Sequence, residues 1–395
     1  MNTAVKNVAI IGAGLGGLAC AIALRKQGLN VRVYEQAKDF RPVGAGIGLA
    51  PNGFNSLEAI EPNLVTSIKS SGCCVSKSTL KNTLGETISS DPINSIFLDK
   101  YGHSLVTIWW WNLQQILASL LPPEIIYLDR RFIDFQQNED GVEIYFANGK
   151  TARADLLIGA DGIKSAVRKK LTAEEQLRYL GSFCWRAVVQ CDRSFIEPNE
   201  LVFIQGNQQF MYLLNLGDGN ISWITRELSP EYQLSANAAE TKSRVLDEIA
   251  DWAEPIQAIV QATDAERILE GPICDRLPLS SWSKGRVTLL GDAAHPMSPA
   301  MGQGANMTFE DAYELANCLS RFSSIEEAFT NYEKNRLERT KIIQAYSAER
   351  EMRYYETEEQ KAGRETPPES QTIDEIRQWL YSYKPSAVCL VDDLS

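Results

Sequence analysis

The sequence predicts an α/β fold in which one unit, built on a parallel sheet, is interrupted by a second, sheet-forming unit and followed by C-terminal helices. Three observations predict it. The apolar residues 7–11 lead through a glycine-rich turn into a helix and a second strand, as in a βαβ unit. Evenly spaced strand-like segments then fill residues 181–227. An apolar run at 287–290, again followed by glycines, returns the chain to the first unit.

The elements can be placed in chain order from their periodicity. Strands are expected at 7–11, 31–34, 125–128, 132–136, 142–146, 155–158, 183–190, 201–204, 210–214, 221–225 and 287–290. Helices are expected at 18–27, 113–121, 238–252, 307–319, 325–359 and 373–381. The Asn148-Gly149 pair is a hairpin signal. The chain then divides into a discontinuous first unit (1–72, 98–180 and 268–324), a second unit (73–97 and 181–267) and a C-terminal helical region (325–395).

Composition excludes several classes of function. The net charge of −12, without a basic cluster, argues against nucleic-acid binding. The eight cysteines form no C-x-x-C pair and only two histidines occur, so no metal site is expected. No apolar run reaches the roughly 20 residues that span a bilayer, and the N-terminus does not resemble a signal peptide. We expect a cytoplasmic protein without a membrane span.

The first motif is Gly12-Ala13-Gly14-Leu15-Gly16-Gly17, which lies between a strand and a helix. In a Rossmann-like unit Gly12 permits the tight turn, Gly14 lets a pyrophosphate approach the backbone, and Gly17 allows close helix–strand packing. Glu35, at the end of the next strand, can accept hydrogen bonds from ribose hydroxyls and disfavours a 2′-phosphate. The motif predicts FAD or NAD and leaves the choice between them open.

Two further motifs carry a family resemblance. The segment 155–168 contains Gly159-Ala-Asp161-Gly162 and ends in Arg168, and 291–306 reads GDAAHPMSPAMGQGAN. In this order after the glycine motif, they resemble the DG and GD fingerprints of the class A flavoprotein monooxygenases. That family includes p-hydroxybenzoate, salicylate and 3-hydroxybenzoate hydroxylases and, more distantly, zeaxanthin epoxidase. The 44–47 segment (GAGI) also matches, and the resemblance spans nearly the whole chain.

The resemblance implies a bound FAD, a transient NADH or NADPH, and O₂ as co-substrate. The first unit would be the FAD-binding domain and the second the substrate-binding domain. A flavin C4a-hydroperoxide would hydroxylate or epoxidise a small aromatic or otherwise apolar organic substrate. The alternatives are an FAD-dependent oxidoreductase that inserts no oxygen and a flavin-binding protein without turnover. Either a monomer or a homodimer is compatible with the sequence.

The resemblance also implies roles for individual residues. Asp292 would accept hydrogen bonds from the ribityl chain, and Pro299 would lie beside the reactive flavin edge. The backbone N–H groups of 302–306 would stabilise the anionic reduced flavin at a helix N-terminus. The remaining cofactor contacts are implied for Ala45, Gly46, Asp161, Gly302, Gly304, Ala305 and Asn306.

The sequence departs from the family pattern at two places. Trp110 stands where the family carries an arginine that neutralises the pyrophosphate, and we expect Arg41 to compensate. The Trp109–Trp111 triplet could stack on a ligand or pack in the core. The second unit also has no histidine in 181–227 to act as a general base, which leaves Tyr212 and His295 as candidates for proton transfer.

Strand alternation puts Phe210, Tyr212 and Leu214 on one face of their strand and Met211 and Leu213 on the other. Neighbouring strands carry two tryptophans and two arginines: Trp185, Arg186, Trp223 and Arg226. Pocket and core positions are equally compatible for the tryptophans. Both arginines are expected at the surface; either one in a pocket would favour a carboxylated substrate.

Overall fold

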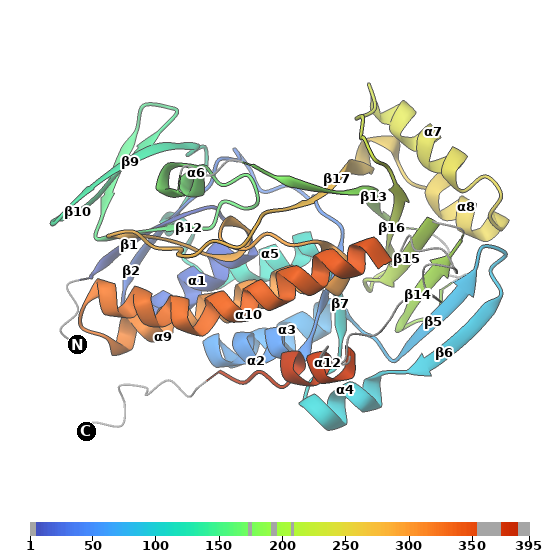
Figure 1. Cartoon of the computed structure of the whole chain (residues 1–395), viewed down its shortest axis with the longest axis horizontal. Helices are drawn as coiled ribbons and strands as arrows, with labels where there is room; N and C mark the ends of the chain where they lie inside the picture. The colour runs from blue at the N-terminus through green and yellow to red at the C-terminus, as the bar shows by residue number, and fades with distance from the viewer. Residues whose placement is uncertain (1–4, 173–175, 191–195, 207–208, 354–372, 386–395) are drawn as a thin grey trace.

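The computed structural model describes residues 5–172, 176–190, 196–206, 209–353 and 373–385. Two sheets lie toward opposite ends of the molecule, and the long helix α10 (Ile325–Arg353) runs between them (Figure 1). In these residues no helix is long and apolar enough to cross a membrane.

The first unit is built on a five-stranded parallel sheet with the order β18-β12-β1-β2-β8. Its strands are β1 (Asn7–Ile11), β2 (Asn30–Tyr34), β8 (Ile126–Tyr127), β12 (Leu156–Gly159) and β18 (Val287–Leu289). The strands β12 and β18 are buried throughout, and in β1 only Asn7 is exposed. This burial explains their continuous apolar sequences and confirms that the glycine-flanked run at 287–290 returns to the first sheet.

Helices cover this sheet and link it to the rest of the chain. They are α1 (Leu15–Lys26), α2 (Pro51–Ile60), α3 (Pro62–Ser71), α5 (Trp110–Ser119), α6 (Ala166–Thr172) and α9 (Gly304–Arg321). Helix α9 packs against α1 and α2 on one side and against α10 on another. Residues 306–319 of α9 are therefore all buried, including its acidic side chains. Those buried carboxylates require partners from neighbouring helices.

Two small sheets complete the first unit. One contains β9 (Phe132–Asn138), β10 (Gly141–Phe146) and β11 (Thr151–Ala154); the other contains β3 (Gly46–Leu49), β4 (Cys73–Cys74) and β7 (Val106–Trp109). The Asn148-Gly149 turn joins β10 to β11, and Gly149 has a φ of 78°, which confirms the hairpin signal. The strand β11 was not among the expected elements.

The second unit is a seven-stranded sheet with the order β17-β13-β16-β15-β14-β5-β6. Its strands are β5 (Lys77–Asn82), β6 (Thr87–Pro92), β13 (Arg178–Gln190), β14 (Glu200–Gln205), β15 (Gln209–Asn215), β16 (Asn220–Leu228) and β17 (Leu269–Asp275). Only the β14–β5 pair is parallel. Strand β17 pairs with β13, so it lies in this sheet and not in the first unit, where the sequence-based division placed it.

One face of the seven-stranded sheet packs against α7 (Ala238–Glu248) and α8 (Glu254–Gln261). The sequence predicted one helix over 238–252. The chain instead ends α7 at Glu248 and starts α8 at Glu254, with Pro255 in its first turn, a position that favours a new helix start.

The other helices in the described part of the chain are α4 (Asn94–Tyr101), α12 (Ile373–Tyr381) and four short 3₁₀ helices: η1 (Pro123–Ile125), η2 (Ala265–Arg267), η3 (Gly291–Ala293) and η4 (Pro299–Met301). Helix α12 matches the predicted 373–381 and lies against α2. Helix α10 is described as far as Arg353, so the predicted continuation to 359 lies outside the described residues.

Candidate active site

The glycine motif forms the turn between β1 and α1. Gly12 has a φ of 105°, and a Cβ there would lie 2.4 Å from the carbonyl oxygen of Ala160. A Cβ on Gly17 would lie 2.0 Å from the Gly12 oxygen. Both glycines are therefore required by the fold. Gly14 differs, because its φ of −74° suits any residue and a Cβ would meet nothing within 4 Å. The open space at Gly14, beside the N-terminus of α1, is where a bound pyrophosphate would fit.

Glu35 is held beside this turn. Its carboxylate accepts hydrogen bonds from the backbone N–H groups of Ala13 and Ala37, both at 2.8 Å. Arg41, which the sequence analysis expected to contact the pyrophosphate, has a side chain that is 73% exposed and pairs with Asp39 at 3.0 Å. The polar side chain that contacts the glycine turn is Gln114 of α5, which donates from Nε2 to the Ala13 oxygen at 2.8 Å.

The tryptophan triplet spans the end of β7 and the start of α5. Trp110 lies against Gly44, where a Cβ would approach its side chain to 3.0 Å, and its backbone N–H donates to the oxygen of Ala45. Trp109 donates from its ring nitrogen to the Gly44 oxygen at 3.2 Å. Gly46 is also packed tightly, and its N–H donates to Ser222 of β16 at 2.9 Å. These contacts place the tryptophans in the packing around the 44–46 segment.

The DG motif caps a helix and joins the GD motif. The Asp161 carboxylate accepts hydrogen bonds from Ser165 Oγ at 2.5 Å and from the N–H of Ala166 at 2.7 Å, at the start of α6. Burial raises the pKa of Asp161, and these hydrogen bonds oppose the rise. Arg168 is 1% exposed and donates to the carbonyl oxygens of Ala293 and Ala294 at 3.2 and 2.7 Å. Arg168 therefore fixes the two fingerprints against each other.

The GD motif brings Asp292 to the N-terminus of α9. Asp292 remains exposed, yet the surrounding chain removes enough water to raise the pKa of its carboxyl group, an effect that nearby His295 opposes. A Cβ on Gly304 would have the Asp292 carboxylate, at 3.8 Å, as its one neighbour within 4 Å. Gly302 has a φ of 61° and open space at its Cβ position. Asp292 and the first turn of α9 thus face the same open region.

Asn306 fastens this helix start to the neighbouring segments. It is fully buried, accepts from the N–H of Ala50 at 2.9 Å, and donates to the oxygens of Gly48 and Gly302 at 3.2 and 2.9 Å. Its side chain is therefore used within the chain, while the backbone N–H groups at the start of α9 lack intrahelical partners by their position.

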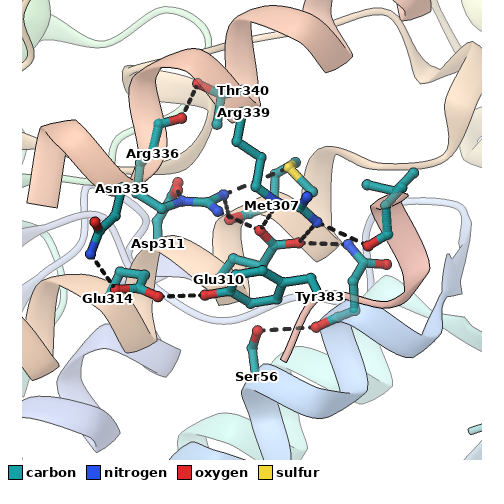
Figure 2. Close-up of polar contacts among 12 residues, drawn as sticks. Ser56, Met307, Glu310, Asp311, Glu314, Asn335, Arg336, Arg339, Thr340 and Tyr383 are labelled. Atoms are coloured by element: carbon teal, nitrogen blue, oxygen red, sulfur yellow. Dashed lines mark hydrogen bonds and ion pairs between the residues drawn. The ribbon is translucent and has the colours of Figure 1, made fainter. Parts of the chain in front are cut away.

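A buried charge network joins α9 to α10, directly after the GD motif in the sequence (Figure 2). Asp311 accepts from the N–H of Gly291 at 3.0 Å, contacts His295 Nε2 at 2.5 Å, and accepts from Arg336 Nε at 2.7 Å. Burial alone would raise the pKa of Asp311, but His295 and Arg336 outweigh it, and the pKa lies below its usual range. His295, 1% exposed, also packs on Trp282. These contacts give His295, a residue of the GD motif itself, a structural role.

Glu310, adjacent to Asp311, forms the second half of the network. Arg336 and Arg339 of α10 both donate to its carboxylate, and together they keep the pKa of Glu310 below its usual range despite full burial. Asn52 donates from Nδ2 to Glu310 at 2.8 Å and to Gln303 at 3.0 Å. Because the two arginines lie on a helix whose charged sequence gave no sign of burial, sequence reasoning missed them.

The second sheet presents Tyr212 toward the first unit. Met211 and Leu213 pack with α7 and α8, whereas Tyr212 and Leu214 lie on the opposite face, which confirms the predicted alternation. Trp185 and Trp223 belong to the core on the far face, so they line no pocket on the Tyr212 side.

Arg226 is the clearest correction to the sequence analysis. It was expected at the surface, but it is 2% exposed, while Arg186 is exposed as predicted. Arg226 donates from Nη1 to Glu351 at 2.7 Å and from Nη2 to the Tyr212 hydroxyl oxygen at 3.0 Å. Glu351, at the end of α10, supplies the compensating charge from 125 residues away, a pairing that no local pattern indicates.

Glu351 also contacts the loop that contains Ser298 and Pro299. It accepts from Ser182 Oγ of β13 at 2.9 Å and from Ser298 Oγ at 2.5 Å. Ser298 immediately precedes the exposed Pro299 and accepts from the N–H of Ala300 at 3.1 Å. Tyr212, Arg226, Glu351 and Ser298 therefore form one continuous chain of contacts. Within the described residues, no group of three or more histidine, cysteine or acidic side chains is arranged to hold a metal.

Known proteins share this sequence and fold. Residues 6–347 match the family described as FAD binding domain. Aurachin C monooxygenase/isomerase of Stigmatella aurantiaca is 33% identical over 84% of this chain and 85% of its own length. The 6-hydroxynicotinate 3-monooxygenase of Pseudomonas fluorescens is 31% identical over 86% of this chain and 90% of its own. The chloroplastic zeaxanthin epoxidase of Spinacia oleracea is 33% identical over 80% of this chain, which spans 47% of that protein.

Among solved structures, Klebsiella pneumoniae HpxO, complexed with FAD and uric acid, superposes with a TM-score of 0.84 over 96% of this chain and 93% of its own, at 24% identity. The open space at Gly14, the exposed Asp292 and the start of α9 fit the FAD that the family binds. The extent of the family match and the identities of the relatives confirm the predicted resemblance and do not support the alternative of an oxidoreductase that inserts no oxygen. The chain belongs to the FAD binding domain family and is a class A FAD-dependent monooxygenase.

Proposed function

We propose that this monooxygenase uses O₂ and NADH or NADPH to hydroxylate or epoxidise a small aromatic or otherwise apolar substrate held between Tyr212 and the Pro299 loop. The observation that carries the proposal is the chain of contacts from Tyr212 through Arg226 and Glu351 to Ser298, which joins the substrate-side sheet to the flavin-side loop. Relatives that act on 6-hydroxynicotinate and 3-amino-4-hydroxybenzoate support an aromatic substrate carrying a hydroxyl group.

Several residues would hold FAD. The N–H groups around Gly14 would bind the pyrophosphate, Glu35 the adenosine ribose, and Asp292 the ribityl chain. The backbone from Gly302 to Asn306, including Gly304 and Ala305, would place N–H groups and the α9 dipole beside the negative charge of the reduced ring. Bound FAD supplies the electrons, taken from the nicotinamide, that activate O₂.

Three further residues from the sequence analysis keep supporting roles. Asp161, through its cap on α6, and Ala45 and Gly46, through their packing, would shape the site without touching the reacting atoms. The Arg41 side chain is exposed and pairs with Asp39, so its contact with the pyrophosphate would form only when FAD binds. Gln114, hydrogen-bonded to the glycine turn, is the polar group of α5 that approaches the place of the missing arginine.

Tyr212 would handle the proton of a phenolic substrate. Because Arg226 donates to the Tyr212 oxygen, the tyrosine hydrogen is directed elsewhere, as a donor to substrate requires. His295 is less suited to this task, since it is buried and engaged by Asp311. The Arg226 charge is balanced by Glu351, so recognition of a substrate carboxylate by Arg226 is not needed.

The cellular setting is a further part of the proposal. The cysteines that the structure describes are all free, which supports a reducing compartment such as the cytoplasm. A monomer and a homodimer are both compatible with the site, because all the residues named above come from one chain.

The test begins with the absorption spectrum of the purified protein, followed by NADH and NADPH oxidation with 6-hydroxynicotinate, 3-amino-4-hydroxybenzoate and a panel of apolar ring compounds. Incorporation of ¹⁸O from labelled O₂ into a product is the expected result. Tyr212→Phe should lower product formation with a phenolic substrate by about 10²–10⁴-fold while flavin reduction continues. If Tyr212→Phe leaves product formation unchanged, the proposed proton-transfer role is wrong.

A further inference from the structure

Helix α12 packs against the loop around Pro299 and against the start of α9. Leu380 of α12 is fully buried with Met307 of α9 and Ile343 of α10, and Met297 and Met301 pack against them. Met297 and Met301 flank Pro299 on either side, and Met307 lies in the first turns of α9. The apolar contacts of one side chain on α12 therefore support both parts of the chain that would face the flavin.

A polar connection runs in parallel. Arg339 donates from Nη2 to the Leu380 carbonyl oxygen at 2.9 Å and, from Nε and Nη2, to the Glu310 carboxylate at 2.6 and 3.0 Å. Glu310 in turn accepts from Asn52, which also donates to Gln303, the residue that precedes α9. The guanidinium group that binds α12 thus also holds the carboxylate on which the helix start depends (Figure 2).

The residues after α12 add contacts to the same helices. The Tyr383 hydroxyl donates to Glu314 of α9 at 2.6 Å, and Asn55 of α2 donates to the Tyr383 carbonyl oxygen at 2.7 Å. The rings of Trp379 and Tyr383 lie 4.4 and 4.7 Å from the Arg339 guanidinium carbon. Stacking against both rings fixes the guanidinium in the orientation that its hydrogen bonds require.

We propose that Trp379, Leu380 and Tyr383, the α12 clamp, are positioning residues for FAD: docking of the clamp orders the start of α9 and the Pro299 turn, and FAD binding stabilises that docking in return. The reciprocity follows from linkage, because a segment that raises the affinity for a ligand must itself be stabilised by that ligand to the same extent. The inference rests on the proposed placement of FAD, but on no step of the oxygenation reaction.

The test uses the full-length protein and FAD alone, without nicotinamide or substrate. We expect Leu380→Ala to raise the dissociation constant of FAD about fivefold or more, within the usual range of coupling between two sites. The matched control is Ile256→Ala, another fully buried aliphatic side chain, which lies on α8 behind the far face of the seven-stranded sheet. The control should change FAD affinity less than twofold, although it also loses buried apolar contacts.

Hydrogen exchange supplies the second measurement and needs no variant. In the wild-type protein, amides of residues 373–383 should exchange several times more slowly with FAD bound than without it. Equal FAD affinities for Leu380→Ala and Ile256→Ala would overturn the proposal. So would exchange rates at residues 373–383 that are the same with and without FAD. If Leu380→Ala does not fold, the exchange experiment decides alone. A wild-type protein that binds FAD but inserts no oxygen would contradict the proposed function and leave this inference intact.

Discussion

The buried ion pair between Arg226 and Glu351 gives a quantitative prediction for stability. The two side chains are 1% and 0% exposed, and Glu351 accepts hydrogen bonds from Arg226, Ser182 and Ser298. Glu351→Gln keeps the shape of the side chain but leaves the Arg226 charge without a counterion. Removing one partner of such a pair costs about 3–5 kcal/mol. A loss of 1 kcal/mol lowers the melting temperature by roughly 2–4 °C in a domain of 150–250 residues and by less in a longer chain. For this protein the melting temperature should therefore fall by several degrees, and by at most ~20 °C.

The double variant Arg226→Met/Glu351→Met separates the cost of an unpaired charge from the value of the pair. Replacing a whole buried ion pair by apolar side chains is often neutral or stabilising. Here Tyr212 and two serine hydroxyls also lose a partner, at about 1 kcal/mol each. We therefore expect the free energy of unfolding of the double variant to lie within about 2 kcal/mol of the wild-type value and to be well above that of Glu351→Gln.

The assay is calorimetry of the FAD-loaded proteins, with urea unfolding followed by fluorescence as a second probe. Glu338→Gln on the same helix is the control, because its pair with Lys341 is exposed on both sides, and its melting temperature should not change. A loss of less than about 1 kcal/mol for Glu351→Gln would refute the reasoning. So would a double variant as unstable as the single one.

Three further predictions concern the cofactor site and pH. Gly14→Ala should leave the melting temperature of the apoprotein unchanged but weaken FAD binding at least about tenfold, whereas Gly17→Ala should fail to fold. If Gly14→Ala bound FAD as tightly as the wild type, the open space at Gly14 would not be the pyrophosphate site. Asp292→Asn should raise the melting temperature of the apoprotein at neutral pH, because a carboxyl group whose pKa is raised stabilises the fold only while protonated, and it should weaken FAD binding. Glu227 has a pKa raised to about 7 by burial and by Glu248, so stability should fall as the pH rises through 7 in the wild type; a Glu227→Gln variant with the same pH profile would disprove this.

The first unit could be predicted largely because its chemistry is local. Gly12 and Gly17 are fixed by contacts within one turn, and the strand, turn and helix around them are continuous in sequence. Gly14 was singled out by its place in the glycine motif, and only the structure adds that its backbone angles are ordinary and its Cβ position is open. Asp292 could likewise be predicted from local sequence, because it follows the apolar run of a buried strand.

The rest could not be predicted because it depends on distant partners. Arg226 looks like a surface residue until Glu351 is placed beside it. Helix α10 likewise looks solvent-exposed, yet Arg336 inserts fully buried between two carboxylates of α9. The pairing of β17 with β13 is equally non-local, and its apolar content alone suits either sheet.

Helix α10 has a mechanical consequence. Its 29 residues span about 43 Å at 1.5 Å per residue. Near its start the Tyr332 hydroxyl donates to the Leu289 carbonyl oxygen of β18, and near its end Glu351 forms an ion pair with Arg226 of the seven-stranded sheet. The helix therefore acts as a strut between the two units. A hinge opening between them would have to break a buried ion pair, so a substrate should enter by movement of small local segments, while the two sheets stay in a fixed mutual orientation.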